Sequence, residues 1–131
     1  MRLVLCCGVF DLFHVAHLRH LEQALQMGDE LVVGVTKDAY VRKTGRPIIP
    51  ENERLELVRS IRDVTEARLV DDSIEALKMW MPDIFVKGSD YRKKGLLESE
   101  IAFCKEHDIE IRFTKENPKT TTKIIERIRN G

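Results

Sequence analysis

Two histidines three residues apart, His14 and His17, are the side chains whose type and spacing best suit phosphate chemistry. They follow a short apolar run that ends at Gly8 and precede a segment with helical spacing, so they straddle an expected helix N-terminus. Backbone N–H groups and the helix dipole favour an anion there, and each imidazole can donate to a phosphoryl oxygen. A metal site or two purely structural histidines are the alternatives, although no third zinc ligand stands out nearby.

Apolar runs and helical patterns alternate along the chain and define the elements that must position these histidines. We expect strands near residues 3–7, 31–35, 67–70, 84–86 and 109–113. We expect helices near residues 18–27, 50–61, 72–81, 97–107 and 120–128. This alternation predicts an α/β fold, a doubly wound Rossmann-like five-stranded parallel sheet with helices on both faces, in one domain spanning residues 1–131.

Local signals refine two of these helices. Gly28 follows the first helical pattern and is expected to act as its C-cap. Asp72 with Glu75 three residues later is typical of a capping box at the start of the third helix.

Ligands of such sheets bind beyond the carboxyl ends of the strands, near the point where strand order reverses. The residues after each strand are therefore the expected lining of a site. They are residues 8–17, 36–50, 70–73, 87–94 and 114–122.

Composition limits the class of protein. The 131 residues carry 22 basic and 22 acidic side chains, and a net charge of zero disfavours nucleic acid as a partner. No apolar stretch approaches a membrane span, and three cysteines that include an adjacent pair do not make a disulfide framework. We expect a cytoplasmic protein without a membrane or nucleic-acid partner.

Four sequence motifs resemble those of a known protein family. Gly8–His17 resembles the G-x-F-D-x-x-H-x-G-H signature of the cytidylyltransferase-like nucleotidyltransferase superfamily, with Ala16 where that family usually has Gly. Residues 45–54 and 82–91 resemble the heptose-phosphate adenylyltransferase branch, and Thr120–Ile124 resembles the S-T-T-x-I motif. The motifs cover nearly the whole chain in the family's order. The length also resembles glycerol-3-phosphate cytidylyltransferases, but Lys115–Pro118 stands where those enzymes have R-T-E-G.

The resemblance implies transfer of a nucleoside monophosphate from ATP or CTP to a phosphorylated sugar or polyol, with release of pyrophosphate. It also implies Mg²⁺, whose protein ligands the sequence does not identify, and a homodimer. The partners would be a nucleoside triphosphate and a phosphorylated small-molecule acceptor. The alternatives are a CTP-using glycerol-3-phosphate cytidylyltransferase, an enzyme that adenylylates a flavin phosphate, and a nucleotide-binding regulatory module without catalysis.

The same resemblance suggests roles for individual residues. Catalytic roles fall to His14, His17, Lys43 and Lys115. Nucleotide binding falls to Gly8, Val9, Phe10, Asp11, His14, His17, Lys87, Gly88, Asp90, Tyr91, Thr120, Thr121 and Thr122. Substrate binding falls to Arg46 and Arg54.

Several of these residues have a plainer interpretation. The basic loop of Lys43 and Arg46 can be solvated, and Arg42 can replace Lys43 because the register of this loop is not fixed. Asp90 can cap a helix, and so can one of the threonines. Arg54 can pair with Glu51 or Asp29, while Phe10 favours packing and Asp11 favours pinning a turn through backbone N–H groups.

Overall neutrality is compatible with local charge. We expect His14, His17, Lys43, Arg46 and Lys115 to gather around the phosphates and to make the site strongly cationic.

Overall fold

Five strands and their connecting helices follow one another in the order that the apolar runs predict. A computed structural model describes residues 1–42, 44–89, 95–115 and 121–130. The strands are β1 (Leu3–Gly8), β2 (Glu30–Thr36), β3 (Glu66–Val70), β4 (Ile84–Lys87) and β5 (Glu110–Phe113). The helices in these ranges are α1 (Val15–Leu25), the 3₁₀ helix η1 (Asp38–Tyr40), α2 (Glu51–Arg59), α3 (Ser73–Trp80), α5 (Glu98–Glu106) and α6 (Thr121–Asn130).

The sheet is parallel throughout, with the strand order β3-β2-β1-β4-β5. The chain moves outward from β1 to β3, crosses back to β4 on the other side of β1, and ends at β5. Strand order therefore reverses between β1 and β4, where Cys6 lies opposite Val86. This topology confirms the predicted doubly wound sheet and puts the switch point, the expected ligand crevice, at the carboxyl ends of these two central strands.

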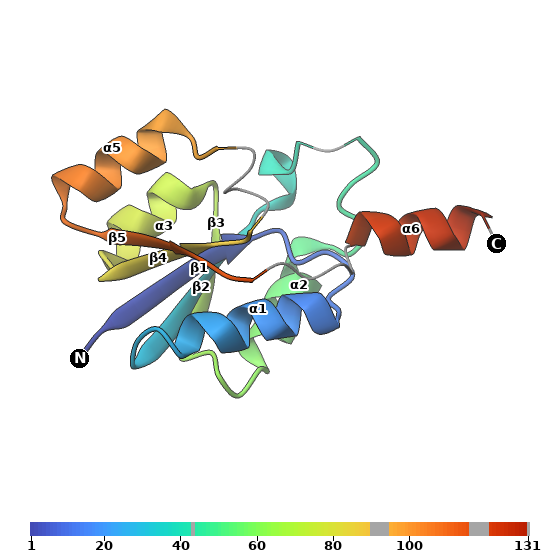
Figure 1. The fold of residues 1–131 in the computed structure, drawn as a ribbon. Coiled ribbons are helices and arrows are strands. Elements are labelled where there is room, and N and C mark those ends of the chain that lie inside the picture. The colour runs from blue at the N-terminus through green and yellow to red at the C-terminus, as the bar shows by residue number, and fades with distance from the viewer. Residues whose placement is uncertain (43, 90–94, 116–120, 131) are drawn as a thin grey trace.

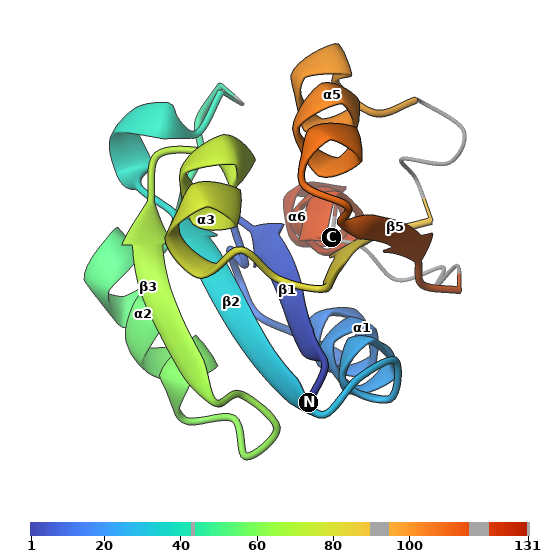
Figure 2. The same ribbon diagram turned by 90° about the vertical axis from the view of Figure 1, so that its left-hand side faces the viewer.

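Two helix layers enclose the sheet. Helices α1 and α2 cover one face, and α3 and α5 cover the other (Figures 1 and 2). Successive residues of β1 serve the two cores in turn: Val4 and Cys6 face α1 and α2, and Leu5 faces α3 and α5. Helix α6 extends away from the sheet on the side where the strands end (Figure 1).

Gly28 does not cap α1, contrary to the prediction. The helix ends at Leu25, with Gln26 as a C-cap in ordinary right-handed conformation. Gly28 instead packs against the start of β1, where an added Cβ would lie 2.6 Å from Val4 Cγ2 and 2.9 Å from the Arg2 carbonyl oxygen. Close approach of two backbone segments, rather than helix termination, explains the glycine.

The capping box of α3 is half formed. The Asp72 carboxylate accepts from the Glu75 N–H at 2.9 Å, as predicted. Glu75 Oε1 accepts from the N–H of Asp71 at 3.1 Å, one residue before the N-cap. Both contacts stabilise the turn that leads from β3 into α3.

None of the helices in the described ranges is long and apolar enough to cross a membrane.

Substituting Gly28 tests the close packing beneath α1. We expect Gly28→Ala to lower the free energy of unfolding by about 1–3 kcal/mol, because the methyl group displaces Val4 or the Arg2 backbone. Urea denaturation measures the change. Gly88→Ala is the matched control, since an added Cβ there meets nothing within 4 Å. Equal losses of stability in the two variants would contradict the packing account.

Candidate functional site

His14 and His17 form the N-terminal cap of α1. His14 is the N-cap residue, and its Nδ1 accepts from the Ala16 N–H at 3.1 Å. His17 reaches back, and its Nδ1 accepts from the His14 N–H at 3.2 Å. The two rings stack with centroids 4.1 Å apart. The predicted pair is therefore brought together at the helix N-terminus, directly after β1 and at the switch point of the sheet.

These contacts define the tautomer of each neutral imidazole. A ring nitrogen that accepts a hydrogen bond carries no proton, so the proton of each ring lies on Nε2. Both histidines then offer an Nε2–H donor of the kind that stabilises a phosphoryl oxygen.

His17 is neutral at physiological pH. Burial lowers its pKa from 6.5 to about 4, and the neighbouring His14 and His20 add to the effect. Phe10 lies edge-on to the His17 ring at 5.6 Å between centroids, and Phe13 lies at 5.2 Å. Aromatic packing therefore holds the imidazole in place and keeps it uncharged.

Phe10 is a core residue, as its packing interpretation predicted, and is 5% exposed. Its backbone is left-handed with φ of 54°, which turns the chain after β1 and folds the ring back over Gly8. A Cβ on Gly8 would lie 3.1 Å from two atoms of that ring. Gly8 therefore makes room for Phe10, and this packing accounts for the glycine without a ligand.

Asp11 anchors the loop that precedes α2. Its carboxylate accepts from the N–H groups of Ile48 and Ile49, both at 2.9 Å, and from Arg46 Nε at 2.8 Å. Burial alone would raise the pKa of Asp11, but these N–H groups and the guanidinium bring it below its ordinary value. The anion is thus held by these donors among others, and Arg46 is already paired with it.

Arg54 is fully buried, with 0% exposure. Its Nε donates to the Ile49 carbonyl at 2.9 Å, and its Nη1 donates to the carbonyls of Val9 at 2.7 Å and Thr36 at 2.8 Å. Its Nη2 donates to Asp38 Oδ1 at 2.6 Å. The Arg54 guanidinium therefore connects α2 to Val9, which follows β1, and to Thr36, which ends β2.

This geometry corrects the predicted role of Arg54 in substrate binding. The side chain is enclosed by protein acceptors, so its contribution to the crevice is structural. Its acid partner is Asp38, not the Glu51 or Asp29 that the sequence suggested.

Lys87 ends β4 and turns into the protein. Its Nζ lies 3.1 Å from Glu100 Oε2, and the same oxygen accepts from Ser73 Oγ at 2.6 Å. The two charged side chains are 10% and 1% exposed. Lys87, predicted to bind nucleotide, is thus held by a buried ion pair with Glu100. Gly88 follows it with open space at its Cα, which leaves room for a ligand.

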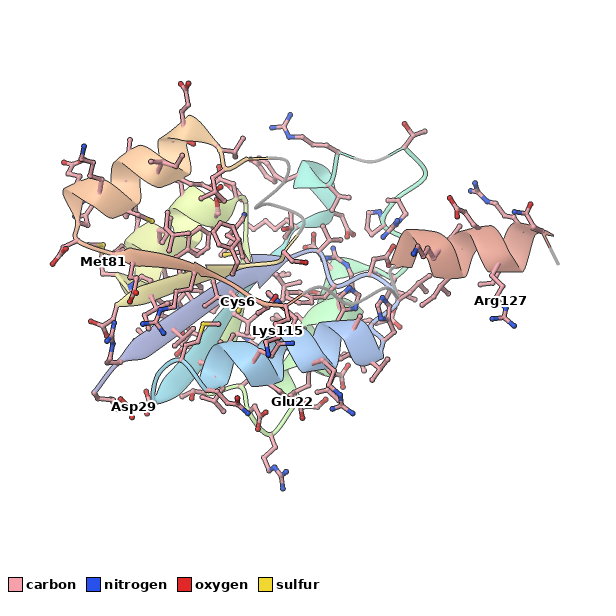
Figure 3. All side chains as sticks on the ribbon, in the orientation of Figure 1. Cys6, Glu22, Asp29, Met81, Lys115 and Arg127 are labelled. Atoms are coloured by element: carbon pink, nitrogen blue, oxygen red, sulfur yellow. The ribbon has the colours of Figure 1, made fainter. Side chains whose placement is uncertain are left out.

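Lys115 lies beside α1 (Figure 3). Its N–H donates to Gln23 Oε1 at 2.8 Å. Gln23 is six residues after His17 on the helix, a rise of about 9 Å. The described contacts therefore do not bring the predicted catalytic Lys115 together with His14 and His17.

Several predicted residues lie outside the described ranges. They are Lys43, Asp90, Tyr91 and Thr120. Thr121 and Thr122 begin α6, but their side chains are also outside what the structure describes. Their roles stay predictions.

The described part of the site is less cationic than expected. His17 is neutral, Arg46 is paired with Asp11, Arg54 is enclosed, and Lys87 is paired with Glu100. The groups that can receive a phosphate at α1 are instead oriented N–H donors. The described residues also contain no cluster of three His, Cys, Asp or Glu side chains that could hold a metal ion.

Sequence reasoning gave no role to four residues that shape the site: His20, and Asp38, Ser73 and Thr114, which lie within the segments expected to line it. Asp38 and Ser73 supply partners to buried charges from other elements. His20 Nδ1 lies 2.8 Å from Thr114 Oγ1, although 94 residues separate them. His20 carried a signal of its own, since it continues the three-residue spacing of His14 and His17.

Comparison with known proteins agrees with this geometry. Residues 5–127 match the family described as cytidylyltransferase-like. The bifunctional protein HldE of a Nitratiruptor species is 38% identical over 134 residues, covering 98% of this chain and 28% of that protein. The FAD synthase of Methanohalophilus mahii is 42% identical over 92 residues, covering 69% of this chain and 65% of that protein. The chain therefore spans just over a quarter of the bifunctional relative.

A solved structure shares the fold. The lipopolysaccharide core biosynthesis protein from Thermoplasma volcanium GSS1 superposes with a TM-score of 0.76 at 32% identity, covering 89% of this chain and 98% of that one. The parallel sheet and the capped helix N-terminus at its switch point define a Rossmann-like domain suited to phosphate. Within that class, the chain belongs to the cytidylyltransferase-like family of nucleotidyltransferases, which confirms the resemblance seen in its motifs.

Removing the Arg54 guanidinium should destabilise the fold strongly. We expect Arg54→Met to cost about 3–5 kcal/mol of unfolding free energy, because three carbonyls and Asp38 lose their donor. Urea denaturation measures it, with the exposed Arg62→Met as the control at under about 0.5 kcal/mol. A loss in Arg54→Met no larger than that of the control would show that the guanidinium is not a structural tie.

The lowered histidine pKa values predict a pH dependence of stability. His17 and His20 each have a pKa of about 4 in the folded protein, against an ordinary value of 6.5. The unfolded chain therefore takes up protons that the folded chain does not, and stability falls as pH drops from about 6.5 toward 4. Each histidine should cost up to about 2 kcal/mol by pH 5.

Urea midpoints at pH 7.5 and pH 5 test this dependence. His20→Phe should remove part of the loss between the two pH values, because it removes one of the two groups. An identical pH dependence in wild type and variant would contradict the assignment to His20.

Proposed function

We propose that this chain transfers a nucleoside monophosphate from ATP or CTP to a phosphorylated sugar or polyol and releases pyrophosphate. The observation that carries the proposal is the histidine pair: two imidazoles, each with its proton on Nε2, at a helix N-terminus on the switch point of the sheet. The motifs nearest to the heptose-phosphate adenylyltransferase branch favour ATP and a sugar phosphate.

In the proposed reaction, a phosphate oxygen of the acceptor forms a bond to the α-phosphorus as the bond to pyrophosphate breaks. The acceptor phosphate is already an anion near pH 7, so the protein need not supply a strong base. The Nε2–H groups of His14 and His17 donate to oxygens on which negative charge develops. The N-terminus of α1 adds its dipole at the same place.

The rigid surroundings support this role. Asp11 and Arg54 hold the loops beside the turn, and Phe10 and Phe13 pack on His17. The donors are therefore oriented before a ligand arrives, which is the condition for electrostatic catalysis.

Mg²⁺ is proposed to arrive with the triphosphate. It would neutralise phosphate charge and keep several waters, so it needs few protein ligands. The lack of an acidic cluster among the described residues fits that mode better than a metal centre built from protein side chains. A homodimer, suggested by the family resemblance, stays a prediction.

Adenylyl transfer to a flavin phosphate is the second candidate. It is favoured by the 42% identity to an FAD synthase over 92 residues. Incubating the protein with Mg²⁺, ATP or CTP, and a panel of heptose 1-phosphate, glycerol 3-phosphate and FMN separates the candidates by which mixture releases pyrophosphate. Nucleotide binding without pyrophosphate from any mixture would favour the regulatory module.

Asparagine variants separate the two nitrogens of each histidine. In His17→Asn, the side-chain oxygen can replace Nδ1 as the cap acceptor, but the shorter amide places its N–H donors away from the position of Nε2–H. We expect kcat to fall at least about 100-fold while the thermal midpoint changes little. The exposed His107→Asn, at the end of α5, is the matched control. Undiminished turnover in His17→Asn would refute the role of His17.

A further inference from the structure

The carboxylate of Glu100 connects three elements at the carboxyl end of the sheet. Its Oε1 accepts from the N–H of Leu97 at 3.4 Å, at the start of α5. Its Oε2 accepts from Ser73 Oγ at 2.6 Å and lies 3.1 Å from Lys87 Nζ. Ser73 is the first residue of α3, and Lys87 is the last residue of β4. One buried side chain therefore fixes how α3, α5 and β4 meet on this face of the sheet (Figure 2).

The ion pair between Lys87 and Glu100 has apolar surroundings. Lys87 Nζ lies 5.2 Å from the centroid of the Phe85 ring, which belongs to the core beneath α3 and α5. The cost of taking two charges out of water can exceed their attraction, and apolar residues of similar volume are often as stabilising as a buried ion pair. Stability alone therefore does not account for charged side chains at this place.

The pair adjoins the switch point of the sheet. Cys6 of β1 lies opposite Val86 of β4, and the next residues of these strands are Cys7 and Lys87. Burial raises the pKa of the Cys7 thiol to about 12, and the charges of Lys87 and Glu100 act on it in opposite directions. Both charged groups are therefore close to the end of β1, the strand that leads into the turn before His14.

The end of β4 is also connected to α1, the helix of the histidine pair. The Lys87 carbonyl accepts from the N–H of Thr114 at 3.0 Å. Thr114 Oγ1 in turn lies 2.8 Å from Nδ1 of His20, which is one turn after His17 on α1. Described contacts therefore place the end of β4 beside the helix whose N-terminus is the proposed phosphate site.

Gly88 follows Lys87 and borders open space. An added Cβ there would meet no atom within 4 Å. Neighbouring strands lie about 4.8 Å apart, so a nucleotide whose phosphates bind at the N-terminus of α1, after β1, is long enough to extend over the end of β4. The open space at Gly88 therefore suits the nucleoside part of such a nucleotide.

We propose that Glu100 and Ser73 are positioning residues that hold Lys87, and with it the backbone at Gly88, where the nucleoside part of the triphosphate binds. They act through Lys87 and Gly88. The inference rests on the proposed function for the identity of the ligand, and nucleotide binding tests it without the transfer reaction. Because the phosphates bind at α1, a displaced Gly88 weakens binding of a nucleotide and leaves binding of pyrophosphate unchanged.

Replacing both charges separates position from stability. In Lys87→Met/Glu100→Leu, apolar side chains of similar volume take the place of the pair, and we expect the urea midpoint to stay the same or rise. The affinity for ATP or CTP, whichever wild type binds more tightly, should fall about tenfold by calorimetry. The affinity for inorganic pyrophosphate should stay within about twofold. Glu106→Gln, exposed at the end of α5, is the matched control and should equal wild type in all three measurements.

Glu100→Gln distinguishes positioning from a direct contact between Lys87 and phosphate. It removes the charge of Glu100 and keeps its shape, so the field of Lys87 at the crevice becomes more positive. A direct contact would then strengthen binding of both nucleotide and pyrophosphate, and that result would overturn the proposal. Positioning predicts weaker nucleotide binding with unchanged pyrophosphate binding.

Ser73 variants cover the case in which Glu100→Gln does not fold, since breaking a buried pair is destabilising. Ser73→Ala removes one hydrogen bond to the carboxylate and keeps both charges. It should lower nucleotide affinity by a smaller factor, and Ser73→Thr, which keeps the hydroxyl, should restore it. Equal loss in Ser73→Ala and Ser73→Thr would overturn the role of this hydroxyl in the proposal.

Gly88→Val tests the location, because its side chain enters the open space. It should weaken nucleotide binding and leave pyrophosphate binding unchanged. Wild-type nucleotide affinity in Gly88→Val or in Lys87→Met/Glu100→Leu, or parallel losses for nucleotide and pyrophosphate, would overturn the proposal. A wild-type protein that binds the nucleotide but transfers none refutes the proposed reaction alone, and one that binds neither ATP nor CTP refutes both.

Discussion

The buried carboxylate of Asp11 is the interaction on which the crevice depends. It stands three residues before His14 and binds the N–H groups of Ile48 and Ile49 from the loop before α2. Arg54 makes the complementary tie, from α2 back to the carbonyls that follow β1 and end β2. The Asp11 carboxylate, in the turn after β1, binds the segment before α2. The Arg54 guanidinium, in α2, binds a carbonyl of the turn after β1, so the two segments are connected by hydrogen bonds from both sides. Without either, the turn carrying His14 would lose its fixed relation to the sheet.

These connections bear on the proposed phosphate site of a chain whose net charge is zero. Formal charges around the crevice are largely neutralised by one another, as in the pairs of Asp11 with Arg46 and Lys87 with Glu100. The N-terminus of α1 offers the proposed ligand a set of oriented dipoles and imidazoles whose Nδ1 atoms accept backbone N–H groups. Such groups stabilise developing charge without the cost of reorganising solvent, because the fold has already aligned them.

The sequence predicts the elements well because the three central strands are local apolar runs, and the edge strands β3 and β5 alternate apolar with charged residues. It also predicts the histidine pair, since the strand, the turn and the helix start are contiguous. It fails where a partner lies far along the chain. Arg54 looks like a ligand contact at a helix start, and no local pattern reveals that carbonyls 18 and 45 residues away surround it. The contacts of Thr114 with His20 and of Lys87 with Glu100 depend in the same way on the order of the strands.

The residues that stabilise the structure around the proposed site differ from the residues that border open space. Asp11, Arg54, Glu100 and Phe10 carry the folding free energy around the crevice, and all are buried. Residues such as Gly88, with open space before it, and the exposed part of the loop after β2 contribute little to that energy. Substitutions in the walls of the proposed site should therefore leave the stability of the scaffold largely unchanged.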